Sequence, residues 1–519
     1  MPSRLPTFWI KLGLAVTVVA AGDLLLFDAK QLGLNLGLLL LSATLALAIA
    51  NRAVWRHRLA LLALFAALMF AGVQFERPSF VACLLWSLAM AVAALAPRAP
   101  RGDDGFRWFQ RLIVGGLKAL VGPVLDLREA LKVRARSRPL KLTGVLLAAI
   151  LPVVGGLIFL ELFAAANPVI GQALAHLSLP EFEPARPIFW LMIGLPVWAV
   201  LRPRGLRKTF KTPGIEGDLN LPGVTAASIT VSLAVFNAVF ALQNGLDIAY
   251  LWSGAGLPKG VTFADYAHGA AYPLIATALL AGLFVLVFLR PGSTTAARPV
   301  VRWLVIAWVA QNVFLVASTA LRTFDYVEAY ALTQMRIAAL IWMALVATGL
   351  LLILWRVLRA KSSGWLINAN LLAVGLVLTL CSVLDLGALT AAWNVRHARE
   401  AGGKGVALDL CYMRTLHGAA VVSLAELERR PVGDDLRNRA EVVRGELVDE
   451  MLRKQAVWRG WRYRDARRLD RLATLGFPPT RIVHQIGRNY RCDGSPVPAP
   501  MPALPPQTPP LTPATNPRT

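Results

Sequence analysis

The chain has 519 residues, of which 56% are hydrophobic and 16% charged, and its formal net charge is +24. This composition is far more apolar than that of a soluble globular protein, so it excludes a soluble enzyme and indicates a protein that crosses a membrane many times. The basic residues lie mainly in short segments between apolar runs, where orientation in a membrane explains them. We therefore expect no nucleic-acid partner.

Apolar runs long enough to cross a hydrocarbon core of about 30 Å follow one another along residues 1–394. They predict an all-α, polytopic membrane protein with about eleven transmembrane helices. The first run has no small-residue cleavage site behind it, so we expect it to remain as an uncleaved anchor. The runs lie near residues 8–27, 32–50, 59–75, 78–96, 142–165, 187–201, 226–250, 267–289, 300–321, 335–355 and 365–391.

Lysine and arginine residues are distributed unequally between the two sets of alternating loops. One set holds 26 of them, and the other holds only 5, which are Lys30, Arg77, Arg186, Lys259 and Arg322. By the positive-inside rule the first set is cytoplasmic. This places the N-terminus inside the cell and the chain after the last apolar run outside the membrane.

The cytoplasmic segment 97–141, between the fourth and fifth apolar runs, is basic and carries a helical apolar pattern. Its basic residues lie on the other faces of that helix, which predicts a helix lying in the membrane interface beside anionic lipids. Packing against other cytoplasmic loops is the alternative. The apolar residues that recur at helical spacing are Phe106, Phe109, Ile113, Leu117 and Leu120.

The C-terminal part divides in two. Residues 395–494 contain helical patterns, and we expect a small helical extracytoplasmic domain that offers a surface to an envelope protein partner. Residues 495–519 are rich in proline and cannot bury a core, which predicts a disordered tail. One apolar stripe at a spacing of three and four residues consists of Leu436, Ala440, Val443, Leu447 and Met451.

Four cysteines are present, and their spacing fits no metal site. Cys411 and Cys492 both lie in the C-terminal part, about 80 residues apart. In an oxidising compartment two thiols in one small domain are expected to pair and to stabilise it. The alternative is two free thiols too distant to bridge. Cys83 and Cys381 lie in apolar runs and are expected to stay reduced. The sequence does not identify a cofactor.

Amide and carboxylate side chains interrupt two of the apolar runs. Polar groups at membrane depth are costly, so they usually face a bundle interior or a cavity. A ligand-lining surface and a seam of hydrogen bonds between helices both remain open. The residues are Asn237, Gln243, Asn244 and Asp247 on one run and Gln311 and Asn312 on another.

A second polar group falls at the outer ends of the later apolar runs. Because antiparallel neighbours joined by short loops usually pack together, we expect this group to converge with Asp247 into one pocket. A salt bridge between Glu328 and Arg336, or of one of them to Asp247, would offset the cost of these charges near lipid, and a purely structural clasp is the alternative. The residues of this group are Tyr266, His268, Tyr326, Glu328 and Arg336.

Several motifs carry a family resemblance. They are Asp247-Ile-Ala-Tyr-Leu-Trp-Ser-Gly-Ala-Gly-Leu-Pro258, Thr262-Phe-Ala-Asp-Tyr-Ala-His268 and Tyr326-Val-Glu-Ala-Tyr-Ala-Leu-Thr-Gln-Met-Arg336, with Asn394-Val and Leu408-Asp-Leu-Cys-Tyr412 as further anchors. Together they resemble a bacterial membrane protein family, domain-of-unknown-function family 4173 and its relatives. The resemblance implies a polytopic bacterial membrane protein and brings no known reaction. For such a protein in the bacterial inner membrane, the orientation given by the loops places the C-terminus in the periplasm. Gly269 stands where that family commonly has arginine.

Three classes of function fit the sequence. We rank first an envelope sensing or scaffolding protein with a polar pocket at the outer membrane face. A transporter or channel would use the polar faces of the two interrupted runs. A membrane-embedded transferase for lipid-linked or envelope substrates would use outer carboxylates with His268 as acid or base.

The loop asymmetry makes the orientation testable. We expect an alkaline phosphatase fusion after Glu400 to be active and a fusion after Lys211 to be inactive, because only the first would place the enzyme outside the cytoplasm. Phosphatase activity measured in intact cells checks this. The opposite pattern would move every residue assigned to the outer face to the cytoplasmic side.

Overall fold

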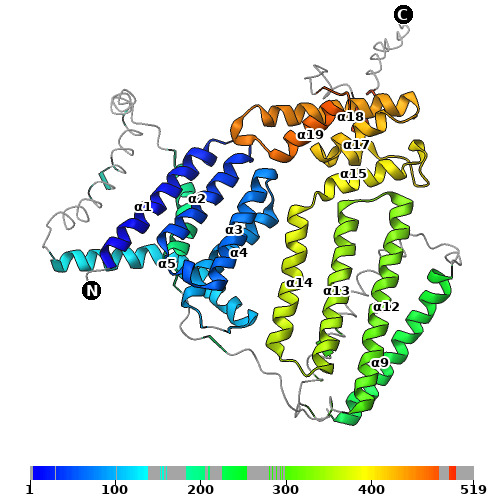
Figure 1. The fold of residues 1–519 in the computed structure, drawn as a ribbon, viewed down its shortest axis with the longest axis horizontal. Helices are drawn as coiled ribbons and strands as arrows, with labels where there is room; N and C mark the ends of the chain where they lie inside the picture. Colours follow the sequence, from blue (N-terminus) through cyan, green and yellow to red (C-terminus); the bar gives the residue numbers. More distant parts are fainter. Residues whose placement is uncertain are drawn as a thin grey trace, which may run out of the picture.

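A computed structural model describes residues 4–29, 31–100, 102–137, 183–204, 209–210, 225–253, 298–478 and 490–497, with single positions between 152 and 295. Apart from one isolated β-bridge between Tyr490 and Pro496, the regular structure of these residues is helical, and the predicted all-α class is confirmed. Two helical bundles stand side by side, and a third group of helices lies across one end of both (Figure 1).

The N-terminal bundle owes its close packing to small residues. Alanines at intervals of three and four on one helix face alanines of the next, which lets the two backbones approach closely, as in many membrane helix pairs. A π-helical turn, η1 (Asp23–Phe27), continues the first helix. The helices are α1 (Arg4–Gly22), α2 (Leu34–Ala50), α3 (Arg58–Glu76), α4 (Phe80–Leu95) and α8 (Ala185–Leu201), and the buried alanines include Ala60, Ala63, Ala67, Ala89 and Ala93.

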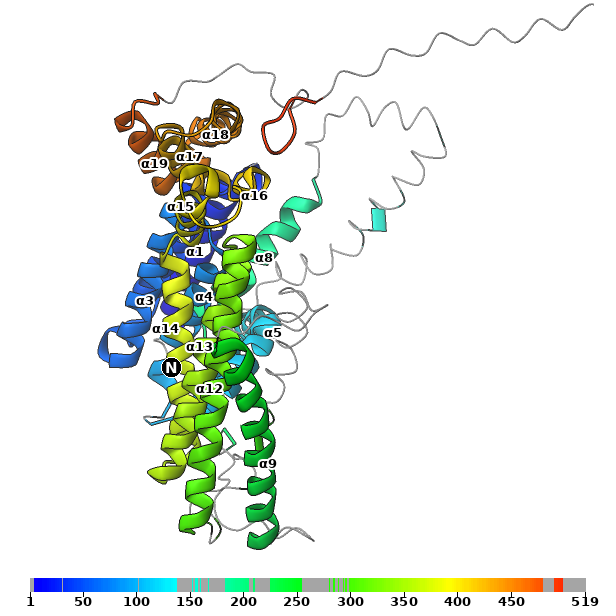
Figure 2. The same cartoon turned by 90° about the vertical axis from the view of Figure 1, so that its right-hand side faces the viewer.

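The second bundle is built from longer helices, which run nearly parallel in Figure 2. Thr333 and Ser362 begin two of these helices by accepting a hydrogen bond from a backbone N–H with their side chains. Leu378 packs against Phe70 and Leu85 of the N-terminal bundle, which joins the two bundles. The helices are α9 (Ala226–Asp247), α12 (Pro299–Tyr330), α13 (Gln334–Leu358) and α14 (Ser363–Val383), with the π-helical turn η4 (Ile248–Trp252) after α9.

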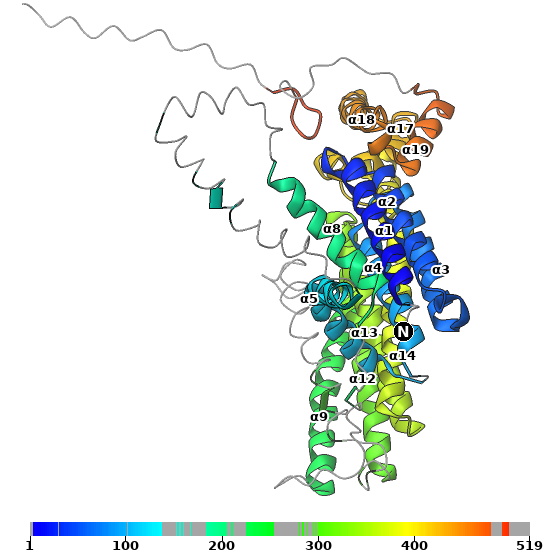
Figure 3. The same ribbon diagram turned by 90° about the vertical axis from the view of Figure 1, so that its left-hand side faces the viewer.

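Helix α5 (Gly105–Ser137) lies across the upright helices, and Figure 3 shows it nearly end-on. The backbone N–H of Gly105 donates to Asn368 Oδ1 of α14 at 2.7 Å, which fixes the start of α5 beside the second bundle. One face of α5 is an exposed apolar stripe, as expected for a helix in the membrane interface. The stripe consists of Phe109, Ile113, Leu117, Val121 and Leu125.

The C-terminal cluster, comprising α15 to α19, packs around its own apolar core. The five residues of the predicted stripe from Leu436 to Met451 are all buried in it. Arg444 makes two hydrogen bonds to Glu428, of 2.6 and 2.9 Å, although burial still raises the pKa of that carboxyl. The helices are α15 (Leu386–His397), α16 (Leu410–Thr415), α17 (Val421–Glu428), α18 (Asp434–Gln455) and α19 (Tyr463–Thr474).

Seven helices of the described chain are long and apolar enough to cross a membrane. Helices α2 and α8 are apolar and have 17 residues each, and they correspond to two further predicted runs. Large apolar side chains such as Leu62, Phe65 and Leu372 are exposed on the outer surfaces, where lipid would cover them. The predicted runs 142–165 and 267–289 and the tail after residue 497 lie outside the described residues, so the total of eleven stays a prediction.

Two predicted boundaries are wrong. The last apolar run was expected to continue to residue 391, but α14 ends at Val383 and Asp385 begins α15, its carboxylate accepting from the N–H of Ala388. Helix α12 continues to Tyr330, so Arg322 lies inside a helix and not in an outer loop. The connection from α12 to α13 is therefore only residues 331–333.

Cys411 and Cys492 form a disulfide with Cα atoms 4.7 Å apart, whereas Cys83 and Cys381 are free. The bridge closes a loop over a sequence separation of 81 and should constrain the unfolded chain. We expect Cys411→Ser to lower the stability of the C-terminal cluster by about 2–4 kcal/mol. Thermal unfolding with and without reductant measures the change, with Cys83→Ser as the control. Equal stability of Cys411→Ser and wild type under oxidising conditions would contradict this prediction.

Candidate functional site

The turn between α12 and α13 is held by the C-terminal cluster. Ala331 has φ of 64° and ψ of 169°, a backbone conformation that is essentially restricted to glycine and costs another residue about 1–3 kcal/mol. The Asn394 amide donates to the carbonyl oxygen of Leu332 at 2.9 Å and accepts from its N–H at 2.8 Å. The N–H of Gln334 donates to the Tyr412 hydroxyl at 2.8 Å. These three hydrogen bonds fix the turn and attach it to α15 and α16.

Arg336 holds the same turn from α13. Its guanidinium donates to the carbonyl oxygens of Tyr330, at 2.7 Å, and Ala331, and its Cζ lies 4.2 Å from the centre of the Tyr326 ring. A cation at the C-terminal end of a helix satisfies carbonyl groups that the helix leaves free. The expected salt bridge between Arg336 and a carboxylate is not formed within the described part of the chain, because these carbonyls occupy the guanidinium.

A cavity of about 240 Å³ lies beside this turn, between the end of α12, the end of α15 and the loop 404–408. Glu328, His397 and Lys404 bring titratable groups to its wall. The His397 ring stacks on Trp393 with a centroid distance of 4.0 Å, and its Nδ1 lies 2.9 Å from the Trp393 carbonyl oxygen. The other lining residues are Val327, Ala331, Trp393, Asn394, Ala398, Gly405, Val406, Ala407 and Leu408.

Glycines shape the wall that carries Lys404. Gly402 has a φ of 83°, in the left-handed region, and a Cβ at Gly403 would lie 2.4 Å from the carbonyl carbon of His397. The N–H of Gly405 donates to the His397 carbonyl oxygen at 2.8 Å. Side chains larger than hydrogen would prevent this close approach. The loop is thereby folded back onto the end of α15, with Lys404 at the cavity.

Inside the second bundle, polar side chains of α9 and α12 meet in what we call the polar seam. Gln311 Nε2 donates to Asn237 Oδ1 at 2.7 Å, and Asn237 Nδ2 donates to the Leu304 carbonyl oxygen at 3.0 Å. Asn244 Nδ2 donates to the carbonyl oxygen of Gln311 at 3.2 Å. Such bonds hold membrane helices together. The seam consists of Asn237, Gln243, Asn244, Asp247, Gln311, Asn312 and Arg322.

A buried ion pair closes one end of the polar seam. Arg322 Nη2 donates to Asp247 Oδ1, and the two side chains are only 3% and 1% exposed. Gln243 Nε2 donates to the same carboxylate oxygen at 3.0 Å. Opposite charges that neutralise each other in this way are the usual solution for ionised groups at membrane depth.

Four oxygen atoms of the polar seam are buried without a hydrogen-bond donor in the described ranges. Polar acceptors of this kind are costly unless water, an ion or a ligand satisfies them. Their residues belong to both α9 and α12, so the seam contains acceptor capacity that its own amides do not use. The atoms are Asn244 Oδ1, Asp247 Oδ2, Gln311 Oε1 and Asn312 Oδ1.

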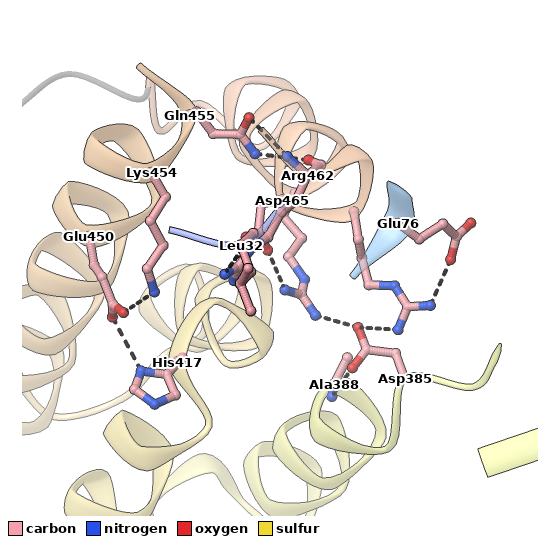
Figure 4. Close-up of polar contacts among 12 residues, drawn as sticks. Leu32, Glu76, Asp385, Ala388, His417, Glu450, Lys454, Gln455, Arg462 and Asp465 are labelled. Atoms are coloured by element: carbon pink, nitrogen blue, oxygen red, sulfur yellow. Dashed lines mark hydrogen bonds and ion pairs between the residues drawn. The ribbon is translucent and has the colours of Figure 1, made fainter. Parts of the chain in front are cut away.

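Helix α19 ties the C-terminal cluster to the N-terminal bundle. Arg464 donates to Glu76 Oε2 at 2.7 Å and lies 3.8 Å from Asp385. Arg462 donates through Nε and Nη2 to the carbonyl oxygen of Leu32, at 3.1 and 2.9 Å. Figure 4 shows Glu76, Asp385 and Leu32 arranged along one side of this helix. The cluster is thus attached to both bundles.

The structure separates the described members of the predicted pocket. Asn237, Gln243, Asn244, Asp247, Gln311 and Asn312 lie in the polar seam, and Glu328 lines the cavity. Tyr326 and Arg336 lie together at the turn. Tyr266 and His268 fall outside the described residues, so a single pocket that includes them stays a prediction.

His397, Lys404 and Arg322 were not among the predicted site residues. A signal for Lys404 is present in Ala401-Gly-Gly-Lys-Gly405, where three glycines surround one lysine. Arg322 was predicted in an outer loop. Asp247, with which it forms an ion pair, was predicted near the same outer end of the bundle. Asn394 was recognised only as an anchor of the family resemblance.

In the described residues, the apolar helices and their exposed aliphatic surfaces define an all-helical fold of the class expected for a protein that crosses a membrane several times. A family model described as "Domain of unknown function (DUF4153)" matches residues 35–427, and the chain belongs to this family. The motifs had predicted domain-of-unknown-function family 4173, which is a different family. The broader prediction of a membrane protein family of unknown function is compatible with the match. No curated protein and no solved structure matches the chain.

The buried ion pair of the polar seam gives a stability prediction. Arg322→Ala leaves the Asp247 carboxylate buried and uncompensated, so we expect a loss of about 3–5 kcal/mol. The combined variant Asp247→Leu, Arg322→Met removes both charges and should recover most of that loss. Thermal unfolding of purified protein measures both, with the exposed Arg396→Ala as control. An Arg322→Ala protein as stable as the control would show that the pair does not stabilise the bundle.

Proposed function

We propose that this protein is an envelope sensing or scaffolding protein of the bacterial inner membrane, with a cytoplasmic N-terminus and a periplasmic C-terminal cluster. The loop asymmetry of 26 to 5 basic residues supports this orientation. The attachment of the C-terminal cluster to both bundles supports this role, because a structural change in the cluster would be transmitted to the outer ends of both bundles.

The position of Glu328 is the observation that carries the proposal. In the stretch from Tyr326 to Arg336, the other polar groups have structural contacts: Thr333 begins α13, and Arg336 stacks on Tyr326 and binds the carbonyl groups of the turn. Glu328 instead lines the cavity and forms no ion pair with another described residue. A carboxylate without a structural partner on a cavity wall is available to a ligand.

The cavity suits a small zwitterion. Glu328 supplies a carboxylate for an ammonium group, Lys404 supplies an ammonium group for a carboxylate, and the Trp393 ring supplies an apolar wall. A volume of about 240 Å³ is below the range of about 300–1,000 Å³ typical of drug-sized ligands. We therefore favour a free amino acid or the end of a short peptide.

Transport through the second bundle is a second candidate. The four buried oxygen atoms of the polar seam favour it, because intramembrane polar groups without partners often mark a solute path. Sodium uptake into liposomes that contain the purified protein, abolished by Asn312→Leu, would support transport over sensing.

Thermal shift measurements with a panel of amino acids and dipeptides test the cavity. A ligand at a concentration of 100 times its Kd stabilises the native protein by about 2.7 kcal/mol. We expect at least one class of zwitterion to raise the Tm of the wild type, and Glu328→Gln and Lys404→Gln to lose the shift without lower abundance. Glu441→Gln, an exposed carboxylate of α18, is the matched control. A shift that survives in Glu328→Gln, or no shift with any member of the panel, would reject the site.

A further inference from the structure

A second cavity lies in the N-terminal bundle, far along the chain from Glu328. It has a volume of about 470 Å³ and opens between α2, α4, α5 and α8. Its walls are aliphatic and aromatic, with Ser87 as a rare polar member. Along α8 it extends from Leu191 to Leu201, which is roughly 15 Å at the helical rise of 1.5 Å per residue. This groove is narrow and apolar, as an acyl chain requires.

Basic side chains gather where the groove ends at Leu201. Lys11 Nζ donates to the Leu201 carbonyl oxygen at 2.7 Å, and Arg202 follows directly in the chain. The Arg202 guanidinium lies 5.3 Å from the centre of the Phe8 ring. Arg98 comes two residues after Ala96, which packs in the same apolar core as Leu201. The three cations come from three different helices or their ends and meet at one end of the groove.

One carboxylate neutralises only part of this positive charge. Asp126 of α5 is buried and lies 3.1 Å from Arg202 and 2.5 Å from Arg204, while Trp198 Nε1 donates to its other oxygen at 2.9 Å. Its two oxygens are thus fully engaged. Lysine and arginine carry three and five donors each, so Lys11 and Arg202 keep donors beyond the contacts described. Among the residues that the structure describes, the end of the groove therefore retains an excess of positive charge.

We propose that this groove binds one acyl chain of an anionic phospholipid, whose phosphate is held by Lys11, Arg98 and Arg202. Charge complementarity identifies the occupant, because an apolar groove that ends in a cation cluster matches the order of tail and headgroup in a lipid. The headgroup end lies on the side that the basic loops assign to the cytoplasm. The site does not depend on the Glu328 cavity, so its failure would leave the proposed function unaffected.

Gly116 provides a selective way to block the groove. It lines the cavity, and a Cβ placed on it would meet no atom within 4 Å, so a leucine there would occupy lipid space without displacing protein. Gly72 of α3 also has open space around it but does not line the cavity, which makes Gly72→Leu the matched control. Arg98 is exposed, and its one described hydrogen bond is 3.5 Å long, so Arg98→Gln removes charge with little effect on packing.

Native mass spectrometry of delipidated protein titrated with dioleoyl phosphatidylglycerol tests the proposal. We expect the wild type and Gly72→Leu to bind one lipid tightly. Gly116→Leu should bind about tenfold more weakly, because several methylene groups lose their burial. Arg98→Gln should bind about fivefold more weakly, because one cation near the phosphate is lost. Thermal unfolding without lipid verifies that each variant is folded.

Two comparisons complete the experiment. Phosphatidylcholine with the same chains should bind more weakly than phosphatidylglycerol, and inorganic phosphate should not protect the protein against unfolding. Equal binding of phosphatidylglycerol by Gly116→Leu and Gly72→Leu would overturn the acyl-chain site. Protection by phosphate equal to that by phosphatidylglycerol would overturn the lipid as the occupant.

Discussion

Asn394 binds both backbone groups of Leu332, and through them it holds the turn that joins the two longest helices of the second bundle. The positive φ of Ala331 is unfavourable for a residue with a Cβ, so contacts with the surrounding residues must offset its conformational free energy. Tyr412 and Arg336 supply part of it from opposite sides. Ala331 and Asn394 also line the Glu328 cavity, so the shape of this cavity depends on the hydrogen bonds between α15 and the turn after α12.

The polar seam obeys a different constraint. In hydrocarbon each polar group needs a partner within the protein, because no bulk water is present to replace it. Amide side chains of α9 and α12 form hydrogen bonds between the two helices, and Arg322 forms an ion pair with Asp247. These interactions make the contact of α9 with α12 specific in a bundle whose apolar residues would tolerate several registers. The remaining acceptor oxygens show that satisfaction of the seam is incomplete among the described residues.

Much of the fold was predictable because apolar length alone decides where a helix crosses a bilayer. The end of α14 was not, since Leu384 and Leu386 continue the apolar composition and only the Asp385 side chain begins a new helix. Among site residues, the amides of α9 and α12 could be found because polar groups are conspicuous in apolar runs. The pairing of Asp247 with Arg322, 75 positions apart, depends on helix packing that the sequence does not display. For the same reason, the sequence could not predict that His397 and Lys404 line the same cavity as Glu328.

The unequal lengths of the two bundles have a consequence for the bilayer itself. At 1.5 Å per residue, α12 with 32 residues is roughly 48 Å long, whereas α3 with 19 residues is roughly 28 Å long. Both bundles are attached to the C-terminal cluster at one end, so their opposite ends lie at different depths, as Figure 1 shows. A helix of roughly 28 Å matches a hydrocarbon core of about 30 Å, so in a bilayer that the N-terminal bundle spans, the far ends of the longer helices would tilt or project beyond that core. Helix α5 lies across the upright helices near the level at which the shorter bundle ends (Figure 1), so its exposed apolar stripe would meet the membrane interface there.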